Sequence, residues 1–257
     1  MKLIQINGWL GRLNGPLERF LLDQKPDFIC IQEAFDPDCK APTFKDQFMY
    51  ISEIIEQGDF QYYSFAPAWG FDMIGTKIDT GNIIISKYPL TQQIKIHTNN
   101  SYNFRKKLSE SQPNTRVWQA CTAEIGDGKK LAISTHQGYL PRLHHEKEDN
   151  DITTASMQKA VDGLNSLDHP LIFCGDLNSH PETPPIKLLE KKTGLKNLVT
   201  ENNVKSTLSE AHRAPKHERN SVVCDYIFVS DDIKVEKFSV SEEVVSDHKA
   251  LILEFSL

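Results

Sequence analysis

The sequence predicts an α/β protein in which two packed β-sheets are flanked by helices. Short apolar runs bounded by turn residues recur along the chain, helical patterns lie between some of them, and a hairpin signal, IGDGKK, joins two others. The 257 residues are at the upper end of what usually folds as one domain, and the sequence contains no clear internal repeat or low-complexity linker. We therefore expect one domain over residues 1–257.

The apolar runs are expected to form strands. They cover Lys2 to Ile6, Asp27 to Gln32, Phe60 to Phe65, Asn82 to Lys87, Arg116 to Ile125, Lys130 to Thr135, Leu171 to Cys174, Val222 to Val229 and His248 to Phe255. Helices are predicted at Pro16 to Leu22, Thr43 to Ile55, Thr153 to Leu167 and Pro185 to Lys191. The least regular tracts are expected to be loops that select the substrate, and they cover residues 66–81, 99–115, 137–151 and 202–221.

Composition and charge narrow the class of protein. A formal net charge of -6 argues against binding nucleic acid by overall charge, so any phosphate contact must be local. No apolar run approaches the length of a membrane span, so we expect neither export nor stable membrane insertion. The five cysteines form no CxxC pair, which favours buried free thiols and a cytoplasmic location. A monomer is the default expectation.

Polar side chains that can bind a metal or carry a proton lie where the apolar runs begin or end. Ligand sites of α/β proteins favour such strand ends. A single Asp or Asn at a strand end more often caps a helix or turn, so no member is informative by itself. Together they predict an active site built from Asn7, Glu33, His136, Asp176, Asn178, Asp225, Asp247 and His248.

The residue types of this set suit a hard divalent cation and a phosphate. Carboxylate and amide oxygens are ligands that Mg²⁺, Mn²⁺ or Ca²⁺ prefer, and without a cation several close carboxylates would repel one another. His136 and His248 can donate hydrogen bonds to phosphate oxygens as charge develops on them. Asp225, on another strand, is a better partner for His248 than the adjacent Asp247, because neighbouring residues of a strand face opposite ways.

Seven segments carry a resemblance to a known family. In chain order they are QIN, IQE, TGNIIISKYPL, ISTHQG, IFCGDLNS, CDYIFVS and SDHKAL. In this order they resemble the signature segments of the endonuclease/exonuclease/phosphatase family, which has the deoxyribonuclease I-like fold, over residue 3 to about residue 256. The resemblance implies a four-layer α/β sandwich of two packed mixed β-sheets with helices outside.

The resemblance also implies a metal site. Asn7 and Glu33 would hold Mg²⁺ or Mn²⁺, with Asp247 near the ion. His144 and His145 look like further ligands, but adjacent histidines in a charged loop are usually solvated, and we expect these two to be so.

The remaining members of the set receive catalytic roles by the same resemblance. Asp176 would orient or deprotonate the attacking water, and Asn178 would position the scissile phosphate. His136 and His248 would contact phosphate oxygens and assist the leaving group, and Asp225 would partner His248.

Three cations are candidates for contacting the substrate phosphate. Arg116 begins a predicted strand after a long loop, and Arg213 and Lys216 lie in the tract HRAPKHER between two of the signature segments. A solvated polar loop explains that tract equally well. The RKK tract at residues 105–107, with aromatic residues nearby, could hold a nucleic-acid strand, and again a solvated loop is the plain alternative.

The expected function is divalent-metal-dependent hydrolysis of a phosphodiester by in-line attack of water, with DNA or RNA as the expected substrate. Some abasic-site nucleases of the family carry an aspartate where this chain has Trp9, and NGWLG is closer to the start of sphingomyelinase-type members. A phosphatase or a phospholipase C-type, sphingomyelinase-like hydrolase of a small or lipid phosphoester is therefore the alternative. A non-catalytic binding module of the same fold is the second alternative.

Overall fold

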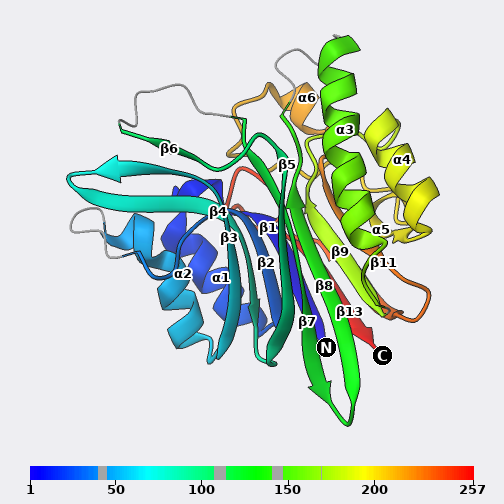
Figure 1. The fold of residues 1–257 in the computed structure, drawn as a ribbon, viewed down its shortest axis with the longest axis horizontal. Helices are drawn as coiled ribbons and strands as arrows, with labels where there is room; N and C mark the ends of the chain where they lie inside the picture. The colour runs from blue at the N-terminus through cyan, green and yellow to red at the C-terminus, as the bar shows by residue number, and fades with distance from the viewer. Residues whose placement is uncertain (40–44, 107–113, 141–146, 169) are drawn as a thin grey trace.

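The computed structural model describes residues 1–39, 45–106, 114–140, 147–168 and 170–257, and its centre is a pair of mixed β-sheets (Figure 1). The first has seven strands, in the spatial order β12 (Lys234–Val240), β13 (Leu251–Ser256), β1 (Lys2–Asn7), β2 (Phe28–Phe35), β4 (Thr76–Ser86), β3 (Tyr62–Met73) and β6 (Asn103–Arg105). The second has six, in the order β10 (Lys196–Asn197), β11 (Asp225–Val229), β9 (Leu171–Asp176), β8 (Lys129–Gln137), β7 (Arg116–Gly126) and β5 (Leu90–Asn99).

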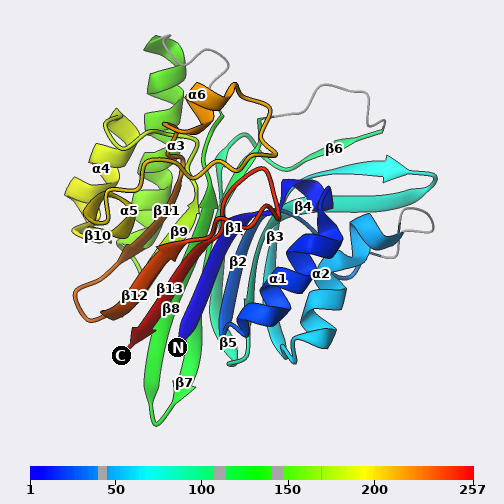
Figure 2. The ribbon, with the colours of Figure 1, turned by 180° about the vertical axis from the view of Figure 1, so that it is seen from behind.

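Helices cover the outer face of each sheet, as the two opposite views show (Figures 1 and 2). The seven-stranded sheet carries α1 (Asn14–Gln24) and α2 (Lys45–Gln57). The six-stranded sheet carries α3 (Lys147–Leu164), α4 (Pro184–Thr193) and the short α5 (Leu198–Glu201). The one-turn elements η1 (Trp9–Gly11) and α6 (Lys216–Arg219) lie in loops. This four-layer arrangement confirms the predicted fold class. Among the described helices, none has the length and apolar character needed to cross a bilayer.

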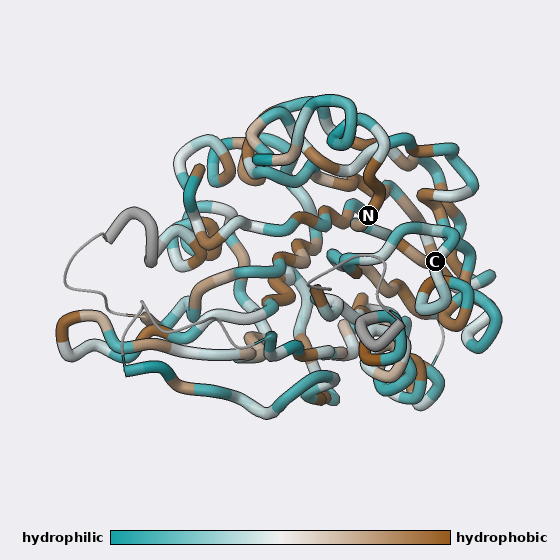
Figure 3. The backbone as a smooth tube through the Cα atoms, turned by 90° about the horizontal axis from the view of Figure 1, so that it is seen from above, coloured by the Kyte–Doolittle hydropathy of each residue, from teal (hydrophilic) through white to brown (hydrophobic). Residues whose placement is uncertain are grey.

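Alternation along the central strands decides which side chains face the second sheet. In β1, Ile4 and Ile6 join the core beneath α1 and α2, whereas Leu3 joins the core between the sheets. The same alternation turns Gln5 and Asn7 toward the six-stranded sheet, where both find hydrogen-bond partners. Hydrophobic segments accordingly concentrate within the sheets, and hydrophilic ones follow the outer loops (Figure 3).

The predicted strands and helices correspond to elements of the structure, with ends shifted by several residues in places. The start of the second helix at Thr43 lies outside the described residues. Strands β5 and β12 were not predicted, because both are rich in polar residues, contain at most one buried residue and show no continuous apolar run. The tract 202–221 includes α6, the tract 99–115 includes β6, and α3 begins inside the tract 137–151.

Two expectations about element limits are wrong. Residues 66–81 are no loop but the paired outer parts of β3 and β4, which protrude beyond the rest of the sheet (Figure 1). Pro67 and a register shift there interrupt the strand pattern in the sequence. The last strand begins at Leu251 rather than at His248, because the backbone of His248 instead forms an isolated bridge with Leu208.

Parallel pairing brings several polar strand ends to one end of the molecule. Strands β1 and β2 run parallel, with Asn7 opposite Gln32, and β8 and β9 run parallel, with Gln137 opposite Asp176. Strand β11 runs antiparallel to β9 and begins at Asp225, opposite Asp176. The carboxyl ends of four strands and the start of a fifth therefore meet where a site can form.

Gly175, next to this strand end, gives a test of how tightly the sheet is built. A Cβ on Gly175 would lie 1.9 Å from the carbonyl oxygen of His136, and its φ of +154° is one that other residues rarely adopt. We expect Gly175→Ala to lower the free energy of unfolding by at least about 3 kcal/mol in urea titrations. Gly15→Ala is the control, since no atom lies within 4 Å of its Cβ position in α1. Equal stability of both variants would contradict this close approach.

Candidate active site

The two sheets meet at the candidate site through a direct bond between their strand ends. Asn7 is the last residue of β1 and Asp176 the last of β9, and Asn7 Nδ2 donates to Asp176 Oδ2 at 3.0 Å. Both side chains are 2% exposed. The loop before β13 also reaches this point, since Ser246 Oγ donates to the carbonyl oxygen of Asn7 at 2.6 Å. Three distant parts of the chain thus converge here.

Asp176 is held by a tight turn that follows β9. Asn178 adopts a φ of +48°, which lets its backbone N–H donate to Asp176 Oδ1 at 3.1 Å and its Nδ2 to Asp176 Oδ2 at 3.3 Å. The Asn178 amide also donates to the carbonyl oxygen of Gly138 at 3.2 Å. Burial raises the pKa of Asp176 to about 6, although His248 and the hydrogen bonds counteract it. Such a carboxylate accepts a proton near neutral pH.

His248 and Asp225 form a buried ion pair beside Asp176. Nδ1 of His248 lies 2.8 Å from Asp225 Oδ2, so the contact expected between these residues is present. Burial lowers the pKa of His248, but the negative charges of Asp225 and Asp176 and the Cys224 thiol outweigh it, and the net pKa lies well above the ordinary value. His248 is therefore protonated at neutral pH, with Nδ1 donating to Asp225 and Nε2 free to donate elsewhere.

Amide side chains between the sheets support this pair. Gln5 Nε2 donates to Asp225 Oδ1 at 3.1 Å and to Gln32 Oε1 at 2.8 Å, and Gln32 Nε2 donates to Thr135 Oγ1 at 2.8 Å. Gln5, Gln32 and Thr135 are all 0% exposed. A buried carboxylate needs hydrogen-bond donors, so Gln5 of the seven-stranded sheet fixes the orientation of Asp225 in the six-stranded sheet.

Two further carboxylates belong to segments that contact Asn7. Glu33 follows Gln32, which lies opposite Asn7 in the sheet, and Asp247 follows Ser246, which donates to the Asn7 carbonyl oxygen. Glu33 lies at a register shift in β2 with a φ of +53°, and its Oε1 accepts from Gln137 Nε2 at 2.9 Å. Burial raises the pKa of Asp247 to about 6, and the charge of Glu33 adds to this rise. Two carboxylates that repel each other beside the amide of Asn7 are a donor set that fits a hard divalent cation.

Two other predicted members, His136 and Arg116, donate to backbone carbonyl oxygens rather than to the carboxylates of the site. His136 Nδ1 donates to the carbonyl oxygen of Val117 at 3.0 Å, and burial lowers the pKa of His136 to about 4, so the ring is neutral. Its Nε2 is buried without a partner. Arg116 is buried and donates from Nε to the carbonyl oxygen of Gly138 at 2.6 Å. Burial lowers the pKa of Arg116, and the negative charges of Glu33 and Asp176 partly counteract this effect.

The other cation candidates lie further out. Arg213 and Lys216 are exposed on the loop before β11, and within the described residues neither forms a hydrogen bond or ion pair with the buried members of the site. From the same loop, His212 packs its ring edge-to-face against His248, with centroids 6.1 Å apart. His144, His145 and Lys107 lie outside the described residues.

Several residues of the site carry no motif of their own in the sequence. Gln5 and Gln32 belong to the QIN and IQE segments, and the two-residue period of a strand is the only signal that places Gln5 on the same face as Asn7. Cys224 precedes Asp225 and points its thiol at the Asp225–His248 pair. Its place beside Asp225, the predicted partner of His248, is the one sequence signal for this contact. No sequence signal brings His212 to His248, since that contact depends on how the loop before β11 folds back.

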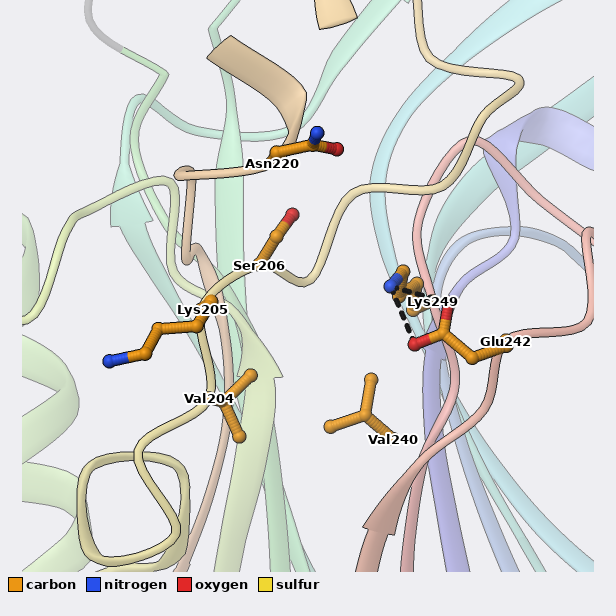
Figure 4. Close-up of a pocket in the computed structure, with 7 residues that line it drawn as sticks. All are labelled: Val204, Lys205, Ser206, Asn220, Val240, Glu242 and Lys249. Atoms are coloured by element: carbon orange, nitrogen blue, oxygen red, sulfur yellow. Dashed lines mark hydrogen bonds and ion pairs between the residues drawn. The ribbon is translucent and has the colours of Figure 1, made fainter. Parts of the chain in front are cut away.

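A surface pocket of about 310 Å³ includes Lys249, the residue after His248, in its lining (Figure 4). It is lined by Val204, Lys205, Ser206, Asn220, Val240, Glu242 and Lys249. Lys249 Nζ binds both carboxylate oxygens of Glu242 at 2.8 Å, so this cation is already neutralised. The pocket is separate from the candidate site, because its lining includes none of the predicted site residues.

Solved structures of known proteins share this architecture. The human Nocturnin catalytic domain with bound sulfate anion matches with a TM-score of 0.68 at 15% identity, over 100% of this chain and 94% of that chain. The mannosyl-6-phosphatase of Bacteroides thetaiotaomicron VPI-5482 matches with a TM-score of 0.65 at 14% identity, over 100% of both chains. A mutant beta toxin of Staphylococcus aureus with bound magnesium ions matches with a TM-score of 0.59 at 17% identity, over 98% of both. At these identities the likeness shows a common fold.

Comparisons of the sequence test which family the chain belongs to. A comparison with curated proteins finds no match. The family model described as the Endonuclease/Exonuclease/phosphatase family matches residues 5–248, a span that begins at Gln5 and ends at His248, the two side chains that flank Asp225. This match supports a phosphoester hydrolase. The chain belongs to the endonuclease/exonuclease/phosphatase family.

Proposed function

We propose that the protein is a divalent-metal-dependent phosphoesterase that hydrolyses a phosphodiester by in-line attack of water. The observation that carries the proposal is that a buried proton acceptor and a buried proton donor lie close together. Asp176, with a pKa raised to about 6, is a proton acceptor, and the nearby His248, with a pKa above its ordinary value, is a proton donor.

Oxygen atoms of Asn7, Glu33 and Asp247 would hold the cation, and Mg²⁺ or Mn²⁺ suits this donor set best. When bound, such an ion polarises a phosphoryl oxygen and neutralises developing charge. The raised pKa of Asp247 and its repulsion by Glu33 support this assignment, because a site built only for stability would not place two like charges together.

The residues of this chain then divide the reaction between them. Asp176 takes a proton from water as the water oxygen attacks phosphorus, and Asn178 orients the phosphate from the turn after β9. His248, fixed by Asp225, donates a hydrogen bond to a phosphate oxygen and protonates the leaving oxygen as the P–O bond breaks. His136, neutral and buried, is the member whose role has the least support, since its free Nε2 is an acceptor.

DNA or RNA is the substrate class we propose first, and a small or lipid phosphoester is the second candidate. The second is favoured by the net charge of -6 and by the full mutual coverage with a mannosyl-6-phosphatase. A substrate panel separates them: single- and double-stranded DNA, RNA, bis-p-nitrophenyl phosphate, a phosphocholine lipid and a sugar phosphate, each with Mg²⁺ and with EDTA. Turnover of the sugar phosphate alone would exclude a nuclease, and no turnover of any member would favour a binding module.

Removal of the proton acceptor should abolish turnover. Asp176→Asn keeps the size of the side chain and can retain the hydrogen bond to Asn178, but it cannot accept a proton from water. We expect kcat on bis-p-nitrophenyl phosphate to fall by about 10² to 10⁴. Asp231→Asn, at an exposed ion pair with Lys196, is the control and should keep full activity. A kcat within about threefold of wild type for Asp176→Asn would sink the proposed mechanism.

Removal of a metal ligand should weaken Mg²⁺ binding, which can be measured by thermal unfolding without substrate. Wild-type protein should melt at a higher temperature in Mg²⁺ than in EDTA, because an ion that binds only the folded state stabilises it. Glu33→Gln should lower the Mg²⁺ affinity, read from the dependence of Tm on Mg²⁺ concentration, by at least about tenfold. Glu236→Gln, exposed on β12, should behave as wild type. An unchanged affinity of Glu33→Gln would refute the ligand assignment.

The Asp225–His248 pair sets a pH dependence. Asp225 raises the pKa of His248, so protonated His248, and the activity that depends on it, is present at low pH and lost as pH rises through this raised pKa. Asp225→Asn removes the charge, and the alkaline limb of the kcat/KM profile should move to lower pH while the acid limb, set by Asp176, moves less. An alkaline limb at the same pH in both proteins would show that His248 does not carry the essential proton.

A further inference from the structure

Asp176, Asp225 and His248 with their buried neighbours form the reaction centre of the candidate active site. One side chain of this reaction centre has no part in the proposed hydrolysis. Cys224 lies directly before β11, is 7% exposed, and contacts Asp225 and His248 of the centre and the neighbouring Thr207. Its Sγ lies 3.4 Å from Asp225 Oδ2, 3.8 Å from His248 Nδ1 and 3.5 Å from Thr207 Oγ1. Cys224, Asp225 and His248, together with Asp176, offer four potential ligand atoms, all within 4.8 Å of one another.

This group differs in chemistry from the oxygen donors assigned to Mg²⁺ or Mn²⁺. It combines a sulfur, an imidazole nitrogen and two carboxylates, whereas Asn7, Glu33 and Asp247 offer oxygen alone. Thiolate and imidazole ligands select borderline or soft ions such as Zn²⁺, and four protein ligands in a closed arrangement are typical of tetrahedral zinc. Hard ions such as Mg²⁺ avoid sulfur.

The distances agree with a tetrahedral ion. With Zn–S of about 2.3 Å and Zn–N and Zn–O of about 2.0 to 2.2 Å, donors around zinc lie about 3.6 Å apart for sulfur with nitrogen or oxygen, and about 3.4 Å apart for nitrogen with oxygen. The two sulfur distances, 3.8 Å and 3.4 Å, are already close to these values. His248 Nδ1 and Asp225 Oδ2, now 2.8 Å apart around a shared proton, must separate. The ligand oxygen of Asp176 lies within 4.8 Å of the other three ligand atoms.

We propose that the reaction centre holds a second, inhibitory metal site in which Zn²⁺ is bound by Asp176, Cys224, Asp225 and His248. The ion displaces the proton shared by His248 and Asp225 and the proton of the Cys224 thiol, and both are released to solvent. While it is bound, Asp176 cannot accept a proton, and His248 is no longer an imidazolium, so its remaining Nε2–H is too weak an acid to protonate the leaving oxygen. The inhibition rests on the proposed function, but the binding of zinc does not.

The test measures metal binding without substrate. Zn²⁺ is titrated into the metal-free protein in competition with a chromophoric chelator, and we expect one high-affinity ion per chain. Cys224→Ser should weaken this affinity at least about tenfold, because a hydroxyl is a poor zinc ligand. Cys39→Ser is the matched control, since Cys39 is also 7% exposed but lies in the core beneath α2, and it should keep the wild-type affinity.

Co²⁺ provides a second readout that does not depend on the variant folding. Bound in place of Zn²⁺, it should give the wild-type protein a thiolate-to-cobalt charge-transfer band and the intense visible absorption of a tetrahedral ion. The Cys39→Ser protein should retain this band. Absence of the band in wild-type protein, equal zinc affinity of Cys224→Ser and wild type, or an equal loss in both serine variants would each overturn the proposal. Zinc binding to a protein without phosphoesterase activity would instead refute only the proposed function.

Discussion

The burial of two carboxylates between the sheets is the constraint on which the rest of the structure depends. Asp176 and Asp225 lie opposite each other at the ends of β9 and β11 with at most 2% exposure, and an uncompensated buried charge is expensive. Their partners come from the opposite sheet and from the loop before β13, namely Asn7, Gln5 and His248. The two sheets can therefore pack only in the register that satisfies these groups, and the same register assembles the site.

Much of the fold follows from local sequence pattern. Strands in the interior, such as β2 and β9, have long buried apolar runs that only a central strand requires, and they could be predicted from the sequence. The edge strands β5 and β12 could not be predicted in this way. β5 and β12 each pair with one neighbour, and β5 has one buried residue and β12 none, so no buried apolar run marks them. Their position is decided by backbone pairing, which single-sequence patterns do not report.

The candidate site was predictable to the extent that its residues stand at strand ends. Three of its residues stand at strand ends, namely Asn7, Asp176 and Asp225, and the strand arrangement brings them together. Glu33 lies within β2, at a register shift, and His248 precedes its strand by a loop, so their positions depend on backbone geometry with no counterpart in hydropathy. Gln5 illustrates the limit most clearly, because an amide in an alternating strand normally faces water, and only the second sheet turns it into a support for Asp225.

The placement of β1 between β2 and β13 has a consequence for how the chain folds. β2 follows β1 after only η1 and α1, whereas the contact of Asn7 with Ser246 spans 239 residues of sequence. During synthesis the free edge of β1 must wait for β13, which is made much later, and contacts of such separation form slowly. The exposed edge of this apolar strand is a point where a nascent chain can pair wrongly or aggregate. Completion of the reaction centre and protection of this edge are therefore the same late folding event.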